Sequence, residues 1–452
     1  MDKYWLSDPN FIKLCDFVAM GELVCLTGSG ISKGLALKNG SGAPDWFRLL
    51  QSIRSQLEDR LTNTERQDLD ILLTKHSPGE HMIEASSILY HREPEMFMQA
   101  LADSVDLQEG ATSLTHRKLL ELDPKGILTY NYDAAHENAI AQDSRCGVWK
   151  TVLPSDNERI VKILKQTLGA HFLFKMHGTA DDRSSLVLTR ESYRDLFTRY
   201  PYYKPFLQQI FTNHHLLIVG FGMSDPDFET LLRDVFSTFG SPIQEHIVFK
   251  HIKTKSAQDT LYRLRYGLNF LYVEDFAHIP QILADCIRTP GMLLREILDK
   301  SISPTLEHRG EAHSKTRQLS LIGKRCLADL LEARIVSNMA SENDPGYDRD
   351  FENSEYVFTY GVIADSTDDA EYKNFLIRQV IEKSTHGETV AHALMHLRDV
   401  MKKQDFPMVE WWLTYFNTPR FRPDPDNKDS QARVYKYCEA IHYLMKAKYD
   451  IS

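Results

Sequence analysis

The sequence predicts an α/β protein with a parallel sheet and a helical insertion, followed by an all-α C-terminal region. Three observations predict it. Short runs of Val, Ile, Leu and Phe alternate with helical patterns up to about residue 298. A glycine-rich turn directly follows the first of these runs, and only helical patterns appear after residue 320.

The predicted strands are short and dense in apolar residues, as strands buried in a parallel sheet tend to be. They are expected at residues 23–26, 126–129, 171–176, 186–188, 216–219, 246–249 and 269–273. The stretch from about 50 to 122 is too long for a single crossover and predicts several helices in an inserted subdomain.

The composition changes after Pro290. Residues 301–320 are polar and predict a linker or exposed loop, whereas residues from 321 onward show helical patterns, for example around 375–381 and 408–416. Two domains are therefore expected, 1–298 and 299–452. The second is expected to mediate oligomerisation or partner binding.

Composition excludes several classes of function. The formal net charge of −10 argues against a broad basic surface, so direct nucleic-acid binding is not expected. No run approaches the roughly 18 apolar residues of a membrane helix, and the N-terminus is too polar for a secretion signal. The six cysteines are dispersed without a CxxC pair, which predicts a cytoplasmic protein without a zinc site or disulfides.

The turn GSGISKG, residues 28–34, is the first candidate binding element. Gly28 and Gly30 would let the backbone approach a ligand closely, and Ser29 and Ser32 add hydroxyl donors. A helix beginning directly after the turn would point free N–H groups at a diphosphate. The spacing departs from GxGxxG because position 33 is lysine, and a plain strand-to-helix turn remains the alternative.

Polar residues also follow the later strands. Asn131 and Asp133 come after residues 126–129, and His177 closes the strand at 171–176. Ligands of doubly wound sheets lie beyond the carboxyl ends of strands, so these side chains are expected at a functional site. His177 is a candidate general base, because imidazole titrates near neutral pH, although a structural histidine is the alternative.

Two further segments contain candidate residues with structural alternatives. Gly220, Gly222 and Ser224 form a second small-residue turn that could admit a ribose or an adenine. Asp45 precedes an amphipathic helix and does not end a second strand, which disfavours a classical dehydrogenase. Helix capping is the alternative role for Asp45 and Asp133, and the favoured one for Asp225 before Pro226.

In this order, GSGIS with APDW, TYNYD, KMHG and GFGMSDPD resemble the motifs of the sirtuin family, whose catalytic domain is Rossmann-like. The chain departs from protein-deacetylating sirtuins in three ways. It lacks their two CxxC pairs, has Ser29 where they have alanine, and has Phe47 where they have arginine. Residues 177–193 look more like the bacterial sirtuin-like group that cleaves NAD in anti-phage defence. The helical appendage resembles effectors that work beside a HerA-type hexameric ATPase.

The resemblance implies NAD as a substrate that is hydrolysed to ADP-ribose and nicotinamide. Asn131 would orient the ribose and a water molecule, and His177 would act as general base. Asp45 would orient the nicotinamide half and Asp133 would support the ribose. The diphosphate would be held by Gly28, Ser29, Gly30 and Ser32.

The resemblance further implies regulation through a homo-oligomer or an ATPase partner, because uncontrolled NAD destruction would kill the host. Two other functions stay open. One is an NAD-dependent protein deacylase or ADP-ribosyltransferase, and the other is a non-catalytic sensor of NAD or ADP-ribose.

Overall fold

The computed structural model describes residues 3–74, 77–223, 225–301 and 305–339, with residues 359–360, 362–363, 366–372 and 375. The chain divides into two compact units, Met1–Thr289 and Pro290–Ser452. The division falls somewhat earlier than the predicted boundary after residue 298. The role expected for the second domain stays a prediction.

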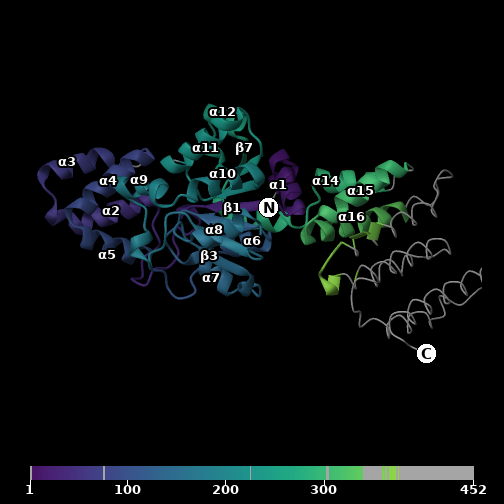
Figure 1. The fold of residues 1–452 in the computed structure, drawn as a ribbon, viewed down its shortest axis with the longest axis horizontal. Coiled ribbons are helices and arrows are strands. Elements are labelled where there is room, and N and C mark those ends of the chain that lie inside the picture. The colour runs from purple at the N-terminus through teal and green to yellow at the C-terminus, as the bar shows by residue number, and fades with distance from the viewer. Residues whose placement is uncertain are drawn as a thin grey trace, which may run out of the picture. The chain divides into compact units, whose positions relative to one another are not determined.

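The first unit is built on a seven-stranded sheet with the order β3-β4-β2-β1-β5-β6-β7, and every pairing in it is parallel. The predicted α/β class is therefore confirmed (Figure 1). The strands are β1 (Leu23–Thr27), β2 (Gly126–Thr129), β3 (Trp149–Val152), β4 (His171–Lys175), β5 (His215–Val219), β6 (His246–His251) and β7 (Leu268–Val273).

One predicted strand was wrong and one observed strand was missed. Residues 186–188 form a loop whose apolar side chains are buried or partly buried against the helices, so a continuous apolar run did not mean a strand here. Conversely, β3 was missed because Lys150 and Thr151 at its centre are exposed. That pattern suits an edge strand, which has a neighbour on one side only.

Helices cover both faces of the sheet. Alternate strand residues such as Leu26, Leu128 and Phe174 join one apolar core with side chains of α8, α10 and α11. Because side chains alternate across a strand, the intervening buried residues face the opposite layer, where α1, α6, α7 and α13 pack on one another. These helices are α1 (Pro9–Met20), α6 (Leu114–Glu121), α7 (Ala135–Ala141), α8 (Asn157–Leu164), α10 (Tyr203–Asn213), α11 (Pro226–Phe239) and α13 (Ile279–Cys286). A further helix, α12 (Ala257–Tyr266), contacts β7 and α11.

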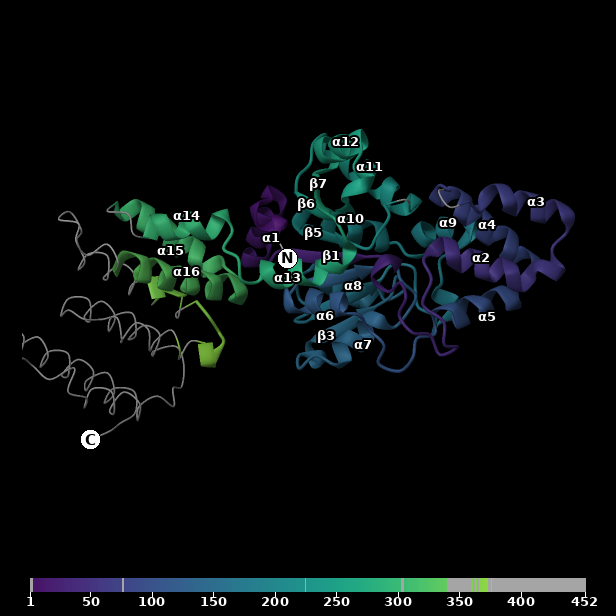
Figure 2. The same cartoon turned by 180° about the vertical axis from the view of Figure 1, so that it is seen from behind.

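The long segment between β1 and β2 forms the predicted helical insertion. It appears as a group of helices beside the sheet in both views (Figures 1 and 2), and it has its own apolar core that includes Leu50, Leu69 and Phe97. The group also packs against α9. Its members are α2 (Trp46–Leu57), α3 (Asn63–Leu72), α4 (Gly79–Arg92) and α5 (Pro94–Val105), and α9 spans Arg190–Arg199.

The described part of the second unit is helical, with α14 (Met292–Ser301), α15 (Leu306–Gln318) and α16 (Leu321–Met339). The linker predicted at 301–320 was therefore wrong, because most of it is α15. Most side chains of α15 are polar, so the sequence did not reveal its narrow buried face, on which Ala312 and Thr316, one turn apart, are both fully buried. The helical patterns predicted beyond residue 375 lie outside the described residues.

Within the described part of the chain, no helix is both long and apolar enough to cross a membrane.

Candidate active site

The carboxyl ends of β1, β2, β4 and β5 meet at one edge of the sheet, where the strand order reverses around β1. Ligands bind at such a switch point in open α/β sheets. A cavity of about 680 Å³ lies there, within the range of roughly 300–1,000 Å³ usual for small-molecule sites. Eight of the predicted site residues line it, namely Gly28, Ser29, Asp45, Asn131, Asp133, His177, Gly220 and Gly222.

The two glycine turns pack backbone against backbone. The N–H of Gly30 donates to the carbonyl of Gly220 at 2.9 Å, and the N–H of Gly28 donates to Val219 at 3.3 Å. A Cβ atom at Gly30 would lie 2.7 Å from the Gly220 oxygen, so glycine is required for this approach. Gly30 therefore joins the two turns and contributes to the cavity indirectly.

Gly30→Ala should force the turns apart. We expect the free energy of unfolding to fall by about 1–3 kcal/mol, the typical cost of overpacking. The dissociation constant for NAD should rise at least about tenfold, the equivalent of 1.4 kcal/mol. Calorimetric titration and thermal melting measure both effects. Gly147→Ala is the matched control, because a Cβ there meets no atom within 4 Å. Wild-type affinity and stability in Gly30→Ala would refute the packing argument.

The helix expected directly after the glycine turn is absent from this described segment, because Ser29–Ile31 forms a single 3-10 turn. The N–H groups of Gly28, Gly30, Ile31 and Ser32 donate to backbone carbonyls. A diphosphate would therefore rely on other donors in the lining, of which Ser29 and Lys33 are the nearest to the turn. Lys33 forms an ion pair with Asp45 at 2.8 Å, a contact that the sequence did not reveal.

Asn131 connects the turns after β1 and β2. Its Nδ2 donates to the Gly28 carbonyl at 3.2 Å and to Ser32 Oγ at 3.0 Å, and only 5% of the residue is exposed. Ser32 is 2% exposed and is not among the residues that line the cavity. The Ser32 hydroxyl thus holds the Asn131 amide in place, whereas the sequence predicted Ser32 as a direct ligand of the diphosphate.

Of the three aspartates considered as helix caps, Asp45 and Asp225 are the N-caps of α2 and α11, whereas the N-cap of α7 is Ala134 and Asp133 lies one residue before it. Asp45 Oδ1 accepts from Arg48 at the start of α2, Asp133 Oδ1 accepts from Ala135, and Asp225 Oδ1 accepts from Asp227. Asp45 and Asp133 also line the cavity, so these hydrogen bonds to the backbone are compatible with ligand contact there. Burial raises the pKa of Asp133, opposed by the Ala135 N–H, Lys175 and Ser32.

His177 lies in an aromatic enclosure. The rings of Tyr130 and Tyr193 stand nearly perpendicular to the imidazole, with centroids 4.7 and 5.1 Å from it. Phe221 stacks on Tyr130 at 4.5 Å. The backbone carbonyl of His177 accepts from Val187, so the apolar loop at 186–188 helps to fix the histidine. The side chain is only 2% exposed, yet it lines the cavity.

Several lining residues were not predicted from the sequence. In the sequence Lys33 was interpreted only as a departure from the dinucleotide pattern. Tyr193 and Phe221 lie in motifs in which other residues were predicted as site residues. The predicted residue Ser224 lies outside the described residues.

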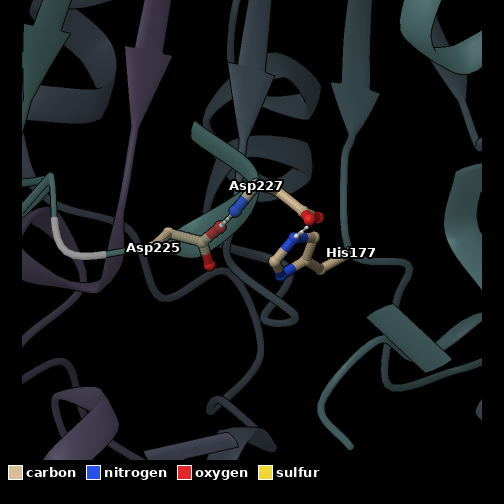
Figure 3. Close-up of side chains that lie close together, drawn as sticks. All are labelled: His177, Asp225 and Asp227. Carbon is tan, nitrogen blue, oxygen red and sulfur yellow. Dashed lines mark hydrogen bonds and ion pairs between the residues drawn. The ribbon is translucent and has the colours of Figure 1, made fainter. Parts of the chain in front are cut away.

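One group of potential metal ligands occurs among the residues that the structure describes. His177, Asp225 and Asp227 are all buried, and their ligand atoms lie within 4.8 Å of one another (Figure 3). None of the described cysteines is in a disulfide, and four of them are buried whereas Cys146 is exposed. The expected absence of zinc stays a prediction.

Comparison with known proteins agrees with the motif resemblance. The family model of the SIR2-like domain matches residues 125–270. The glycine turn at 28–34 lies outside this match, and the structure brings it beside Asn131. A solved structure from a study of the mechanism and regulation of Sir2 enzymes overlaps 64% of this chain and 98% of its own, with 14% identity and a TM-score of 0.33.

Three curated relatives are similar over part of the chain. Defense-associated sirtuin 2 of Bacillus subtilis is 23% identical over 220 residues, which cover 47% of this chain and 19% of that protein. The NAD(+) hydrolase ThsA of Enterococcus faecium is 24% identical over 214 residues, 42% of each chain. ThsA of Bacillus cereus is 22% identical over 253 residues, 55% of this chain and 49% of its own. The matches thus span from a fifth to half of these relatives.

Proposed function

We propose that this chain, which carries a SIR2-like domain over residues 125–270, is an NAD hydrolase that releases nicotinamide and ADP-ribose. We further propose that it acts in the cytoplasm as a regulated effector of anti-phage defence. One observation carries the proposal: Asn131 and His177, from different strands, line one cavity with the Gly28 turn. The names of the three relatives, one a defence-associated sirtuin and two NAD(+) hydrolases, support it.

The proposed chemistry begins with a good leaving group. When the bond between C1′ and the nicotinamide nitrogen breaks, its electron pair neutralises the cationic ring, and the ribose gains oxocarbenium character. Water adds to C1′ and loses a proton. In this proposal Asn131 orients the ribose and the water, and His177 accepts the proton. Asp45, near Lys33, faces the nicotinamide half, and Asp133 supports the ribose.

Control of the activity is assigned to the second unit. We propose that Pro290–Ser452 mediates homo-oligomerisation or binds a HerA-type hexameric ATPase, so that NAD is spared until a trigger arrives. The defence-associated name of the Bacillus subtilis relative supports a role in defence.

Product analysis tests the proposed reaction. The full chain, alone and with a HerA-type ATPase, is incubated with NAD and the nucleotides are separated by chromatography. We expect ADP-ribose and nicotinamide in equal amounts, and their loss in Asn131→Ala, since the amide would no longer orient ribose or water.

The alternatives give different products. O-acyl-ADP-ribose or ADP-ribosylated protein, with little free ADP-ribose, would identify a deacylase or transferase. Tight binding of NAD that stays intact under every condition would identify a sensor. Either result would contradict the proposed hydrolase.

A further inference from the structure

His177 has a buried acidic neighbour. Its Nε2 lies 3.5 Å from Oδ2 of Asp227, an ion-pair distance that is longer than a good hydrogen bond (Figure 3). Asp227 is in the first turn of α11 and is only 7% exposed. Neither of these two atoms has a hydrogen-bond partner among the described residues.

Two buried polar atoms without other partners are costly unless they interact. In the described part of the chain, Asp227 has no Lys or Arg ion-pair partner, so His177 is the group that can compensate its charge. The proline-initiated helix fixes the aspartate, because Asp227 N–H donates to Asp225 Oδ1 at 2.9 Å. Catalytic hydrogen bonds often shorten only when substrate is bound, so a separation of 3.5 Å is compatible with a functional pair.

Asp225 has a different role from Asp227. Both of its carboxylate oxygens are engaged, Oδ1 with the Asp227 N–H and Oδ2 with the Tyr193 hydroxyl at 2.8 Å. A metal ion shared by His177, Asp225 and Asp227 would have to compete with these hydrogen bonds. The geometry therefore favours a His177–Asp227 pair over a three-ligand metal site.

We propose that Asp227 is a positioning residue for His177 in the proposed NAD hydrolysis. Its carboxylate selects the tautomer with the proton on Nε2, which leaves Nδ1 to accept a proton from the water or from a ribose hydroxyl. It also stabilises the imidazolium that forms as water adds. The inference rests on the proposed function and adds a residue that is not among the candidates predicted from the sequence.

The ionisable groups around the pair come from several elements. Asp225 precedes α11, Tyr130 follows β2, Tyr193 is on α9 and Tyr203 is on α10. Burial raises the pKa values of all three phenols, and the two aspartates raise them further. Burial also raises the pKa of Asp227, which His177 opposes and Asp225 reinforces. His177 is thus the group in this enclosure that offsets the negative charge of Asp227.

Asp227→Asn tests the pair because it keeps the shape and removes the charge. We expect kcat for NAD cleavage to fall by about 10–100-fold, as loss of an orienting partner typically does, with a smaller change in KM. Without the carboxylate the neutral imidazole is favoured. The acidic limb of the pH profile of kcat/KM should therefore move to lower pH, a shift that a purely structural role would not produce.

Thermal melting supplies a second readout. Above the raised pKa of Asp227 the ionised carboxylate destabilises the fold, and this cost disappears as the pH falls through that pKa. Asparagine carries no charge, so the melting temperature at pH 8 should not decrease. Asp234→Asn on the same helix, where Asp234 pairs with Lys204, is the control and should keep the wild-type rate and pH profile.

The outcomes separate this inference from the proposed function. Wild-type kcat and pH profile in Asp227→Asn, with His177→Ala inactive, would overturn the pair and leave the hydrolase intact. A lower melting temperature with an unshifted pH profile would make Asp227 structural and also overturn it. Activity lost in EDTA and restored by a divalent cation would assign the cluster to a metal. A wild-type chain that leaves NAD intact would refute both proposals.

Discussion

Replacing His177 with alanine should slow NAD cleavage by about 10²–10⁴-fold, the usual contribution of a general base. The imidazole lines the cavity, and the enclosing rings of Tyr130 and Tyr193 restrict its orientation. Initial rates of nicotinamide release measure the effect, and calorimetric titration should find NAD binding changed much less.

Two further variants make the His177 experiment decisive. His177→Gln fills more of the buried space than alanine and should be equally slow, which separates the loss of a base from the loss of packing. His81→Ala, at an exposed position on α4, should retain the wild-type rate. Full turnover in both His177 variants would exclude His177 as the base.

The sheet was predictable because its strands are short, apolar and followed by glycine or polar residues. Prediction failed in segments where the polarity of the sequence does not indicate the secondary structure. Residues 186–188 are apolar because they pack against the helices beside His177, and α15 is polar because its buried stripe is only as wide as Ala312 and Thr316. The hydrophobic pattern of residues 186–188 does not distinguish this loop from a strand, and that of α15 does not distinguish the helix from a linker.

The site was partly predictable for a geometric reason. Parallel strands bring Gly28, Asn131, His177 and Gly220 to one edge, so residues that follow strands converge on one cavity. Contacts between distant segments were not predictable. Asp227 lies fifty positions after His177, and only the fold places the two together.

Lys175→Met should lower the free energy of unfolding by about 1–3 kcal/mol, the usual cost of leaving buried polar groups without their hydrogen-bond partner. Lys175 ends β4 with no exposed surface. Its Nζ donates to the carbonyl of Asp133 at 2.6 Å, to that of Tyr132 at 3.4 Å and to Glu137 Oε1 at 2.8 Å. Methionine fills a similar volume but leaves these acceptors without their donor.

The same contacts connect stability to the site. The ammonium group ties the loop that contains Asn131 and Asp133 to β4, two residues before His177. Lys175→Met should therefore raise KM for NAD as well as lower the melting temperature by several degrees. Lys150→Met, on the exposed edge strand β3, is the control and should change stability by less than about 0.5 kcal/mol. Equal melting temperatures for the two variants would refute this role.

Glu137→Gln separates the two parts of the Lys175 contact. Glutamine keeps an oxygen that can accept from Nζ but removes the opposite charge, while both backbone carbonyls remain bonded. If the lysine acts mainly on the loop, this variant should lose much less stability than Lys175→Met and should keep the wild-type KM. An equal loss in both variants would show that the ion pair, and not the tether to the loop, carries the effect, because only the ion pair is altered in both.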